Sequence, residues 1–470
     1  MSPRLVAGVD SSTQSTKIVV CDAETGEVVR TSRAPHPDGT SVDPEHWWRA
    51  YEQATQDGML DGVEAIAVGG QQHGMVALDA DGRVIRDALL WNDVRSAAAA
   101  RDLVDELDGA GAWVSRLDVV PVAAFTVAKV RWMRDAEPDN AERLDTVVLP
   151  HDWLTGRILQ AGSGFTGWTT DRGDASGTGY WSPVAGEYDA DIQRLALGRE
   201  FGVPRVLGPS ERAGVTEAGL VVGAGTGDNM GAALGLGLEP GDVVVSLGTS
   251  GTVFAVHDAP TGDASGAIAG FASADGRHLP LMCTLNAARV LTSGAQMLGV
   301  DLAEFSRLAL DAPIGAEGLT LLPYLDGERT PDLPDATGTL GGLTRSNATP
   351  QNLARACVEG MLVNLVAGVE GLVDHGLEAR RIVLIGGASA SPAVRAVAPF
   401  LFGVPVHVPA PGEYVGIGAA RQAAWALLGG DEPPAWSVAY DDVLTAADAD
   451  IDAGRAVLER YRALQRRMHG

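Results

Sequence analysis

Two stretches of the chain show the same order of apolar and polar positions. Near the N-terminus, an apolar run at 5–9 leads to Asp10, a polar loop at 11–16 and a second apolar run at 18–21. This order predicts a β-hairpin with a carboxylate at the start of its loop. Residues 243–254 (VVVSLGTSGTVF) repeat the order around a Gly-Thr-Ser-Gly loop. Two such hairpins, roughly half a chain apart, predict a duplicated fold.

Both predicted loops have the chemistry of a phosphate site. Small hydroxyl residues and glycines leave backbone N–H groups exposed, and successive N–H groups form a concavity that binds anions. Asp10 would hold a cation beside the phosphate. The alternative interpretation is an ordinary hairpin without a ligand, because short motifs often match by chance.

Strand and helix patterns alternate along the rest of the chain. Apolar runs predict buried strands at 65–69, 381–385 and 404–408, and the first two end in glycine-rich turns. Helical periodicity predicts the main helices of the second half at 285–298, 350–375, 391–402 and 413–428. This alternation is typical of an α/β protein.

The chain is long enough for two domains, because 470 residues exceed one ordinary core. The junction is expected near 236–240, just before the second hairpin. Residues 160–190 are rich in Gly, Ser, Thr and Trp, and are expected to form a long loop-like insertion. Beyond Gly430, a proline-rich linker and an amphipathic helix at 450–468 are expected to form a tail.

Composition narrows the possible partners. A net charge of −26 argues against a nucleic acid or an anionic membrane as partner, and an anionic substrate would need local positive charge or a metal ion. We find no signal-peptide pattern and no apolar run of the about 20 residues that a membrane span needs, so we expect a soluble, cytoplasmic protein. Three widely spaced cysteines predict neither a disulfide framework nor a metal site.

Polar residues at the ends of predicted strands mark a candidate site, because α/β folds bind ligands there. Asp228 lies among glycines at a strand-to-helix turn (GTGDNMG), and His73 follows a strand in GGQQHG. The Asp228 carboxylate suits a general base or, alternatively, the N-cap of the next helix. His73 is alternatively an ordinary core or surface histidine. Trp91 (LLWNDVR) either lines the site or belongs to the core.

The chain resembles the FGGY family of carbohydrate kinases from Val6 to about Leu428. The resemblance rests on nine motifs in the family's order: DSSTQSTK at 10–17, GGQQHG at 69–74, LLWNDVR at 89–95, FTVAK at 125–129, TDRGDASGT at 170–178, GTGDNMGAALG at 225–235, VVSLGTSGT at 244–252, GERTP at 327–331 and IGGASASP at 385–392. It implies ATP-dependent phosphorylation of a sugar, first of all D-xylulose. Kinases of ribulose, fuculose or gluconate are alternatives within the family. An ATPase of the actin or chaperone type is the alternative from another class.

The resemblance also implies a role for each candidate residue. Asp228 is expected to be the general base, and Asp10 to hold Mg²⁺ through its waters. The sugar is expected to contact Gln72, His73, Trp91, Asp228 and Asn229. The ATP contacts are expected to be Thr13, Ser15, Thr16, Gly248, Thr249, Ser250, Gly294, Gly386, Gly387 and Ala388.

One residue departs from the family pattern. Gln72 stands where the family's kinases of D-xylulose commonly have methionine. This difference weakens the assignment of D-xylulose as the sugar. The glycerol kinases carry Arg-Glu at positions 72 and 73, and the absence of this pair argues against glycerol.

The implied fold is α/β, with two ribonuclease H-like domains of the actin and hexokinase type and a cleft between them. Each domain is expected to contain a five-stranded mixed sheet. Residues 1–236 would form the sugar-binding domain, residues 237–430 the nucleotide-binding domain and residues 431–470 the tail. ATP and Mg²⁺ would lie in the cleft between the two phosphate loops. Members of the family commonly form homodimers, so the resemblance implies a homodimer.

Overall fold

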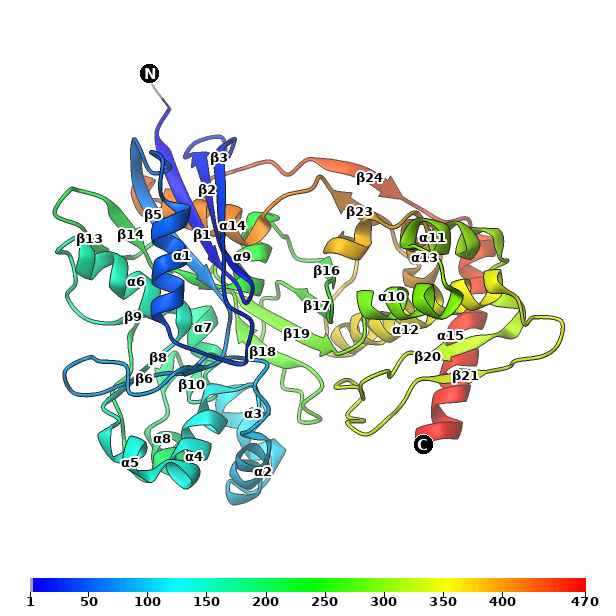
Figure 1. Ribbon diagram of the computed structural model, residues 1–470, viewed down its shortest axis with the longest axis horizontal. Coiled ribbons are helices and arrows are strands. Elements are labelled where there is room, and N and C mark those ends of the chain that lie inside the picture. Colours follow the sequence, from blue (N-terminus) through cyan, green and yellow to red (C-terminus); the bar gives the residue numbers. More distant parts are fainter. Residues whose placement is uncertain (1–2) are drawn as a thin grey trace. The chain divides into compact units, whose positions relative to one another are not determined.

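The computed structural model describes residues 3–470, which divide into two compact units. The first unit comprises the chain up to Leu238 together with His257–Leu279 and Gly412–Val438. The second unit comprises Glu239–Val256, Pro280–Pro411 and Ala439–Gly470. Each unit is built around one large mixed β-sheet, as Figure 1 shows.

The sheet of the first unit has the strand order β13-β14-β5-β1-β2-β3, with β15 beside β5. Its strands are β1 (Leu5–Ser11), β2 (Ser15–Asp22), β3 (Val28–Pro35), β5 (Val63–Gly70), β13 (Arg212–Val215), β14 (Val221–Gly223) and β15 (Thr226–Gly227). The β1–β2 hairpin is antiparallel and places Asp10 opposite Lys17. The neighbouring β5 runs parallel to β1 and places Gly69 beside Asp10. The first predicted hairpin is therefore confirmed.

The sheet of the second unit repeats this topology. Its order is β19-β17-β16-β22-β23-β24, formed by β16 (Asp242–Leu247), β17 (Gly251–Ala255), β19 (His278–Thr284), β22 (Arg381–Ile385), β23 (Val406–Pro409) and β24 (Tyr440–Leu444). Every neighbouring pair has the same direction as its counterpart in the first unit. The predicted duplication is thus confirmed, although each sheet has more than the five strands expected.

Helices and short strands complete both units. In the first unit they are α1 (Glu45–Ala54), α2 (Ala97–Glu106), α3 (Ala110–Leu117), α4 (Thr126–Ala136), α5 (Pro138–Arg143), α6 (Pro150–Ala161), α7 (Arg172–Ser176), α8 (Ala190–Leu197), α9 (Asp228–Gly235), α14 (Tyr414–Leu428), β4 (Ser41–Val42), β6 (Val76–Leu78), β7 (Ala88–Leu89), β8 (Thr146–Val148), β9 (Thr169–Asp171), β10 (Trp181–Ser182), β11 (Glu187–Tyr188), β12 (Arg205–Leu207) and β18 (Ala269–Ala272). In the second unit they are α10 (Ala288–Leu298), α11 (Leu302–Asp311), α12 (Pro350–Asp374), α13 (Pro392–Phe402), α15 (Asp448–His469), β20 (Thr320–Leu322), β21 (Thr339–Gly341) and the 3₁₀ helices Ala316–Gly318 and Gly387–Ala390.

Both faces of the first sheet are buried, as the continuous apolar run in β1 requires. Alternate residues of a strand point to opposite faces. Ala7 and Val9 of β1 therefore join the core that contains Trp47 of α1 and Trp153 of α6. Val6 joins the core on the opposite face, where α14 supplies its alanines. Figure 1 shows α1 and α14 beside this sheet.

Glycines bring α14 into backbone contact with the first unit. A Cβ atom on Gly8 of β1 would lie 1.8 Å from the carbonyl oxygen of Gly416. A Cβ atom on Gly418 would lie 1.8 Å from the carbonyl oxygen of Gly231 in α9. Such approaches are open only to glycine. Residues 412–438 therefore pack in the first compact unit, whereas they were expected in the nucleotide-binding domain at 237–430 and the tail at 431–470.

Residues 160–190 are more ordered than the loop-like insertion that was expected. They contain β9, α7, β10 and β11, and most of residues 169–183 are buried. Asp171 begins α7, because its carboxylate accepts hydrogen bonds from the backbone N–H groups of Gly173 and Asp174. A segment rich in small polar residues thus folds around side-chain caps that periodicity alone does not predict.

The longest core helix of the second unit is α12. Among residues 3–470 it is the one helix that is long and apolar enough to cross a membrane, and 78% of its apolar window is buried in the structure. No apolar run of that length was expected from the sequence. In the same unit α15 packs on α13, and its buried Tyr461 donates a hydrogen bond to Tyr324.

The glycine contacts of α14 lead to a stability prediction. Gly418→Ala places a Cβ atom inside the van der Waals radius of the Gly231 carbonyl oxygen, so we expect the free energy of unfolding to fall by about 1–3 kcal/mol. Gly111→Ala is the matched control, because Gly111 is an exposed helix residue with open space around it. The control should be neutral or stabilising by up to about 1 kcal/mol. Urea unfolding measures both, and equal stability of the two variants would contradict the packing argument.

Candidate functional site

A chain of charges surrounds Asp10 at the end of β1. The Lys17 ammonium donates to Asp10 Oδ2 at 3.1 Å and to Glu413 Oε2 at 2.6 Å. Asp10 is almost fully buried, and its Oδ1 atom has no hydrogen-bond partner. Burial raises the pKa of Asp10, and the nearby Lys17 opposes this effect. A buried carboxylate oxygen without a donor is suited to a cation or to a water bound to one.

Asp228 and Asn229 begin helix α9 in the same unit. Asp228 is the first helical residue and Gly227 occupies the N-cap, so the alternative role of Asp228 as N-cap is excluded. The Asp228 Oδ1 atom accepts from the backbone N–H and the side-chain amide of Asn229, both at 2.8 Å. The same amide donates to Gln72 Oε1 at 3.1 Å. Three of the expected sugar-contact residues therefore form one connected group.

The acidity of Asp228 is strongly shifted. Desolvation and the negative charge of Asp10 raise its pKa to about 7. The side chain is still partly exposed, so the carboxylate can meet a ligand. A carboxylate with a pKa near neutrality is a suitable proton acceptor at physiological pH.

The imidazole of His73 lies in an aromatic setting and is fixed by a backbone carbonyl. Its Nδ1 atom donates to the carbonyl oxygen of Gly177 at 2.6 Å. Its ring stacks on Phe125 with 4.8 Å between centroids and tilts against Phe271 at 5.5 Å. A carbonyl oxygen can only accept a hydrogen bond, so Nδ1 carries a proton.

The backbone of His73 is held as firmly as its ring. His73 has a φ of 65°, a left-handed conformation that is uncommon for non-glycine residues. Its carbonyl oxygen accepts hydrogen bonds from Lys129 Nζ at 2.9 Å and from Thr126 Oγ1 at 3.2 Å. Lys129 is fully buried, and burial lowers its pKa to about 7 against the pull of Asp93.

The loop between β1 and β2 offers fewer free hydroxyls than expected. Thr16 is fully buried, and its hydroxyl bonds His36 Nε2 at 2.8 Å. Thr13 accepts a hydrogen bond from the indole N–H of Trp91 at 2.9 Å. The Ser15 hydroxyl is buried without a partner. Trp91 is 37% exposed, so it is not the core residue of the alternative interpretation.

In the second unit, the 248–250 loop is tied to the start of α10. The carbonyl oxygens of Gly248 and Thr249 accept from the backbone N–H groups of Ala288 and Ala287. Ser250 completes the loop and is partly exposed. The loop N–H groups expected to bind phosphate are not used in these contacts.

The remaining expected ATP residues lie at two places in the second unit. Gly386 has a φ of 88° and packs against the backbone of Leu247, which joins the ends of β22 and β16. Gly387 has open space where a Cβ would stand, and Ala388 lies beside it in a 3₁₀ helix. Gly294 is buried in α10 against Phe305 and Cys357. This packing alone accounts for Gly294, and its ATP contact stays a prediction.

Several residues that support the site were not predicted from the sequence. Lys129 and Glu413 bind His73 and Lys17, but neither stands beside its partner in the sequence. In the second unit, the buried Glu328 accepts from Asn286 and Asn364. The motifs FTVAK and GERTP could have pointed to Lys129 and Glu328, which they contain. The motifs do not reveal which residues these side chains contact.

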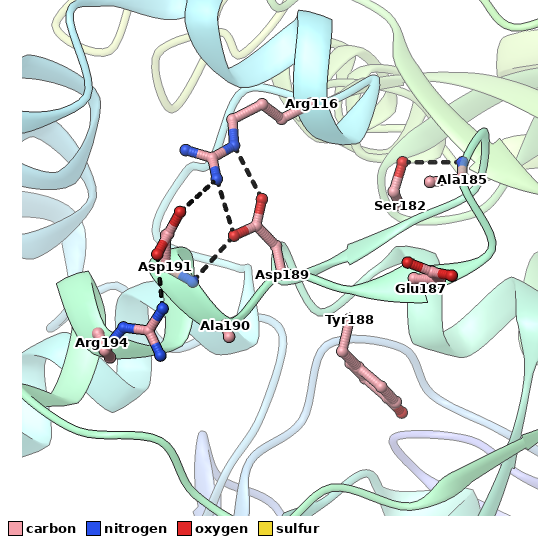
Figure 2. A pocket seen from close by; sticks show the side chains of 9 residues that line it. All are labelled: Arg116, Ser182, Ala185, Glu187, Tyr188, Asp189, Ala190, Asp191 and Arg194. Carbon is pink, nitrogen blue, oxygen red and sulfur yellow. Dashed lines mark hydrogen bonds and ion pairs between the residues drawn. The ribbon is translucent and has the colours of Figure 1, made fainter.

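A pocket of about 350 Å³ lies elsewhere in the first unit. It contains none of the expected site residues, and Figure 2 shows that its charges face one another. Arg116 pairs with Asp189 and Asp191, and Arg194 also pairs with Asp191. The lining residues are Arg116, Ser182, Ala185, Glu187, Tyr188, Asp189, Ala190, Asp191 and Arg194. We assign no role to this pocket, because both of its arginines are already paired with carboxylates.

Comparisons with known proteins cover both halves of the chain. The chain matches the N-terminal and C-terminal domain models of the FGGY family of carbohydrate kinases over residues 5–237 and 243–427. It is 45% identical to a xylulose kinase of Streptomyces coelicolor and 43% identical to one of Streptomyces rubiginosus, each over 95% of this chain and 93% of the other. The crystal structure of xylulose kinase from Bifidobacterium adolescentis superposes with a TM-score of 0.90 and 44% identity, covering 99% of this chain and all of that one.

The site geometry predicts coupled titration of two carboxylates. In the wild-type protein without ligand, Asp228 should titrate near pH 7. In the Asp10→Asn variant its pKa should fall, because the repelling charge of Asp10 is gone. Carboxyl ¹³C chemical shifts measured against pH report both values. Glu24→Gln in an exposed turn is the control and should leave Asp228 unchanged. A wild-type Asp228 that titrates near pH 4 would contradict the geometry.

Proposed function

The chain belongs to the FGGY family of carbohydrate kinases, and we propose that it transfers the γ-phosphoryl group of ATP to D-xylulose, giving ADP and D-xylulose 5-phosphate. Its fold is that of the family, two ribonuclease H-like units of the actin and hexokinase type. The observation that carries the chemistry is the partly exposed Asp228 carboxylate with a pKa near 7, joined to Asn229 and Gln72. The identity of the sugar is supported by the xylulose kinases that are 43–45% identical to the chain.

In this proposal, Asp228 accepts the proton of the attacking sugar hydroxyl. The hydroxyl oxygen forms a bond to the γ-phosphorus, the bond from that phosphorus to the ADP oxygen breaks, and the proton passes to Asp228. In phosphoryl transfer the transition state is largely dissociative, so orientation of the hydroxyl matters as much as its deprotonation. The hydrogen bonds from Asn229 to Asp228 Oδ1 hold the carboxylate in place for both tasks.

The sugar is held by residues around Asp228. We assign hydroxyl contacts to His73, Gln72 and Asn229, with Trp91 at the edge of the site. The His73 ring is fixed by Gly177 and Phe125, which suits a specificity contact. Residues 1–236 would supply the sugar site and residues 237–430 most of the nucleotide contacts. A homodimer stays a prediction.

The residues near Asp10 fit a magnesium ion. Mg²⁺ takes few protein carboxylates and keeps several waters, and the partnerless Oδ1 atom of Asp10 offers one oxygen for such a contact. When bound, the ion would neutralise phosphate charge. Lys17 holds the other Asp10 oxygen and so orients the carboxylate. The phosphates of ATP are assigned to the loops at 13–16 and 248–250, and the adenosine to 386–388.

The substrate is tested by ADP release across a panel of ketoses and polyols with Mg·ATP. We expect strong stimulation by D-xylulose and little by ribulose, fuculose, gluconate or glycerol. Asp228→Asn should lower kcat by about 10²- to 10⁴-fold, the usual contribution of a general base. Stimulation by another sugar would move the assignment to that sugar, with Gln72 the first residue to examine. ADP release that no sugar changes would replace the kinase with an ATPase of the actin or chaperone type.

The magnesium role of Asp10 has its own test. Asp10→Asn should raise the Mg²⁺ concentration for half-maximal activity by about 10- to 100-fold. The reason is that a neutral amide would hold the waters around the ion more weakly than the Asp10 carboxylate does. The magnesium dependence is measured at fixed total ATP, with Glu24→Gln as the control of equal charge change. An unchanged magnesium dependence in Asp10→Asn would remove the metal role.

A further inference from the structure

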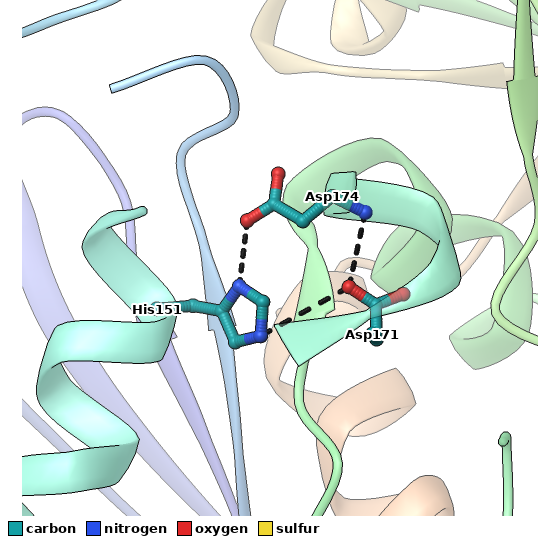
Figure 3. A group of neighbouring side chains, drawn as sticks. All are labelled: His151, Asp171 and Asp174. Carbon is teal, nitrogen blue, oxygen red and sulfur yellow. Dashed lines mark hydrogen bonds and ion pairs between the residues drawn. The ribbon is translucent and has the colours of Figure 1, made fainter. Parts of the chain in front are cut away.

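A second group of charges lies inside the first unit, and the proposed chemistry does not use it. His151 of α6 is surrounded by the carboxylates of Asp152, Asp171 and Asp174, and we call these four residues the His151 cluster. All four side chains are almost completely buried. Figure 3 shows His151 between Asp171 and Asp174.

Both nitrogens of the His151 ring face carboxylates. The Nδ1 atom is 2.6 Å from Asp174 Oδ2, and the Nε2 atom is 3.3 Å from Asp152 Oδ1 and 3.9 Å from Asp171 Oδ1. Burial would lower the pKa of His151, but the three carboxylates outweigh burial and raise it to about 10. The surrounding carboxylates therefore favour the protonated, imidazolium form of the ring.

The ring is packed tightly against the strands that carry the site. A Cβ atom on Gly225 would lie 2.7 Å from His151 Nε2, and one on Gly70 at the end of β5 would lie 2.8 Å from His151 Cβ. Gly225 and Gly70 stand three residues before Asp228 and His73. The Gly225 backbone thus lies close to Nε2, and the Gly70 backbone lies close to the Cβ atom of His151.

A series of contacts leads from His151 to the imidazole of His73. His151 binds the Asp174 side chain in α7. The carbonyl oxygen of Asp174 accepts from the backbone N–H of Gly177 at 3.0 Å. The carbonyl oxygen of Gly177 accepts from His73 Nδ1 at 2.6 Å. Each step is a direct hydrogen bond.

The short helix α7 depends on such support. It has five residues, and an isolated helix of that length is unstable in water. Its position must come from tertiary contacts, and the buried ion pair from His151 to Asp174 is a strong, directional one. Removing the cation would leave buried carboxylates uncompensated, so the helix would shift or Asp174 would take up a proton.

We propose that His151 is a positioning residue for sugar binding, which holds Asp174 and, through Gly177, fixes the tautomer and direction of the His73 imidazole. The proposal rests on the proposed function, because it assumes that His73 contacts the sugar. Arg172 and Tyr180 also lie within electrostatic reach of the cluster carboxylates. Neither makes a hydrogen bond to Asp174 among those the structure shows for residues 3–470.

The test compares two substitutions at one position. His151→Gln removes the charge and His151→Lys keeps it. We expect the KM for the sugar that the panel identifies to rise about tenfold in His151→Gln, the loss of roughly one hydrogen bond. The KM for ATP should stay unchanged, and His151→Lys should recover most of the sugar affinity. His46→Gln in α1 is the control histidine and should leave both constants unchanged.

A structural readout separates this proposal from the proposed function. The His73 Nδ1–H group should give a ¹⁵N-coupled imidazole signal in the wild type and in His151→Lys, and the signal should be lost or exchange-broadened in His151→Gln. Because this signal needs no substrate, it tests the chain of contacts even if the sugar assignment fails. Should His151→Gln not fold, Asp174→Asn replaces it and should weaken the same signal.

Three results would overturn the proposal. One is an unchanged sugar KM and an unchanged His73 signal in His151→Gln or Asp174→Asn. Another is a fall in kcat with equal rises of both KM values that His151→Lys does not reverse. The third is one equivalent of a transition metal in the purified wild-type protein that is lost in His151→Gln, because the cluster would then be a metal site.

Discussion

Backbone contact between helix α14 and strand β1 sets the geometry of the first unit. The two elements touch through Gly8 and Gly416, and no side chain fits between them. Helix α14 crosses α9 in the same way through Gly418 and Gly231. Since Asp10 lies two residues after Gly8 and Asp228 begins α9, this packing fixes the two carboxylates relative to each other. It also brings Glu413, just before α14, to Lys17.

Fixed separation of those carboxylates explains the electrostatics of the site. Burial raises the pKa of both Asp10 and Asp228, and the charge of Asp10 raises the pKa of Asp228 further. Lys17 offsets part of the effect of burial on Asp10. Buried polar atoms without partners gather nearby, on Asp10, Ser15, Gln71 and Gln72. Native proteins leave few such atoms, and a ligand-binding site is where they are expected.

Local patterns were enough to predict the hairpins, the duplicated sheets and the family, and all three are confirmed. They failed where distant segments meet. Nothing in the sequence near residues 412–438 shows that Gly416 packs on Gly8, so the contact of this helix with the first unit was not predicted. The polar loop at 11–16 does not reveal that His36, which follows β3, binds the Thr16 hydroxyl. The His151 cluster needed two segments, 151–152 and 171–174, brought together by the fold.

The two hairpins share their shape but differ in chemistry. Asp10 pairs across its hairpin with Lys17, and the equivalent pair in the second unit is Ser246 with Thr252. Charge is therefore present at this position in only one copy. Asp10, Asp228 and His73 all belong to the first unit, so their mutual distances are set by one packed core. A catalytic group held within one unit stays preorganised, which electrostatic stabilisation of a transition state requires.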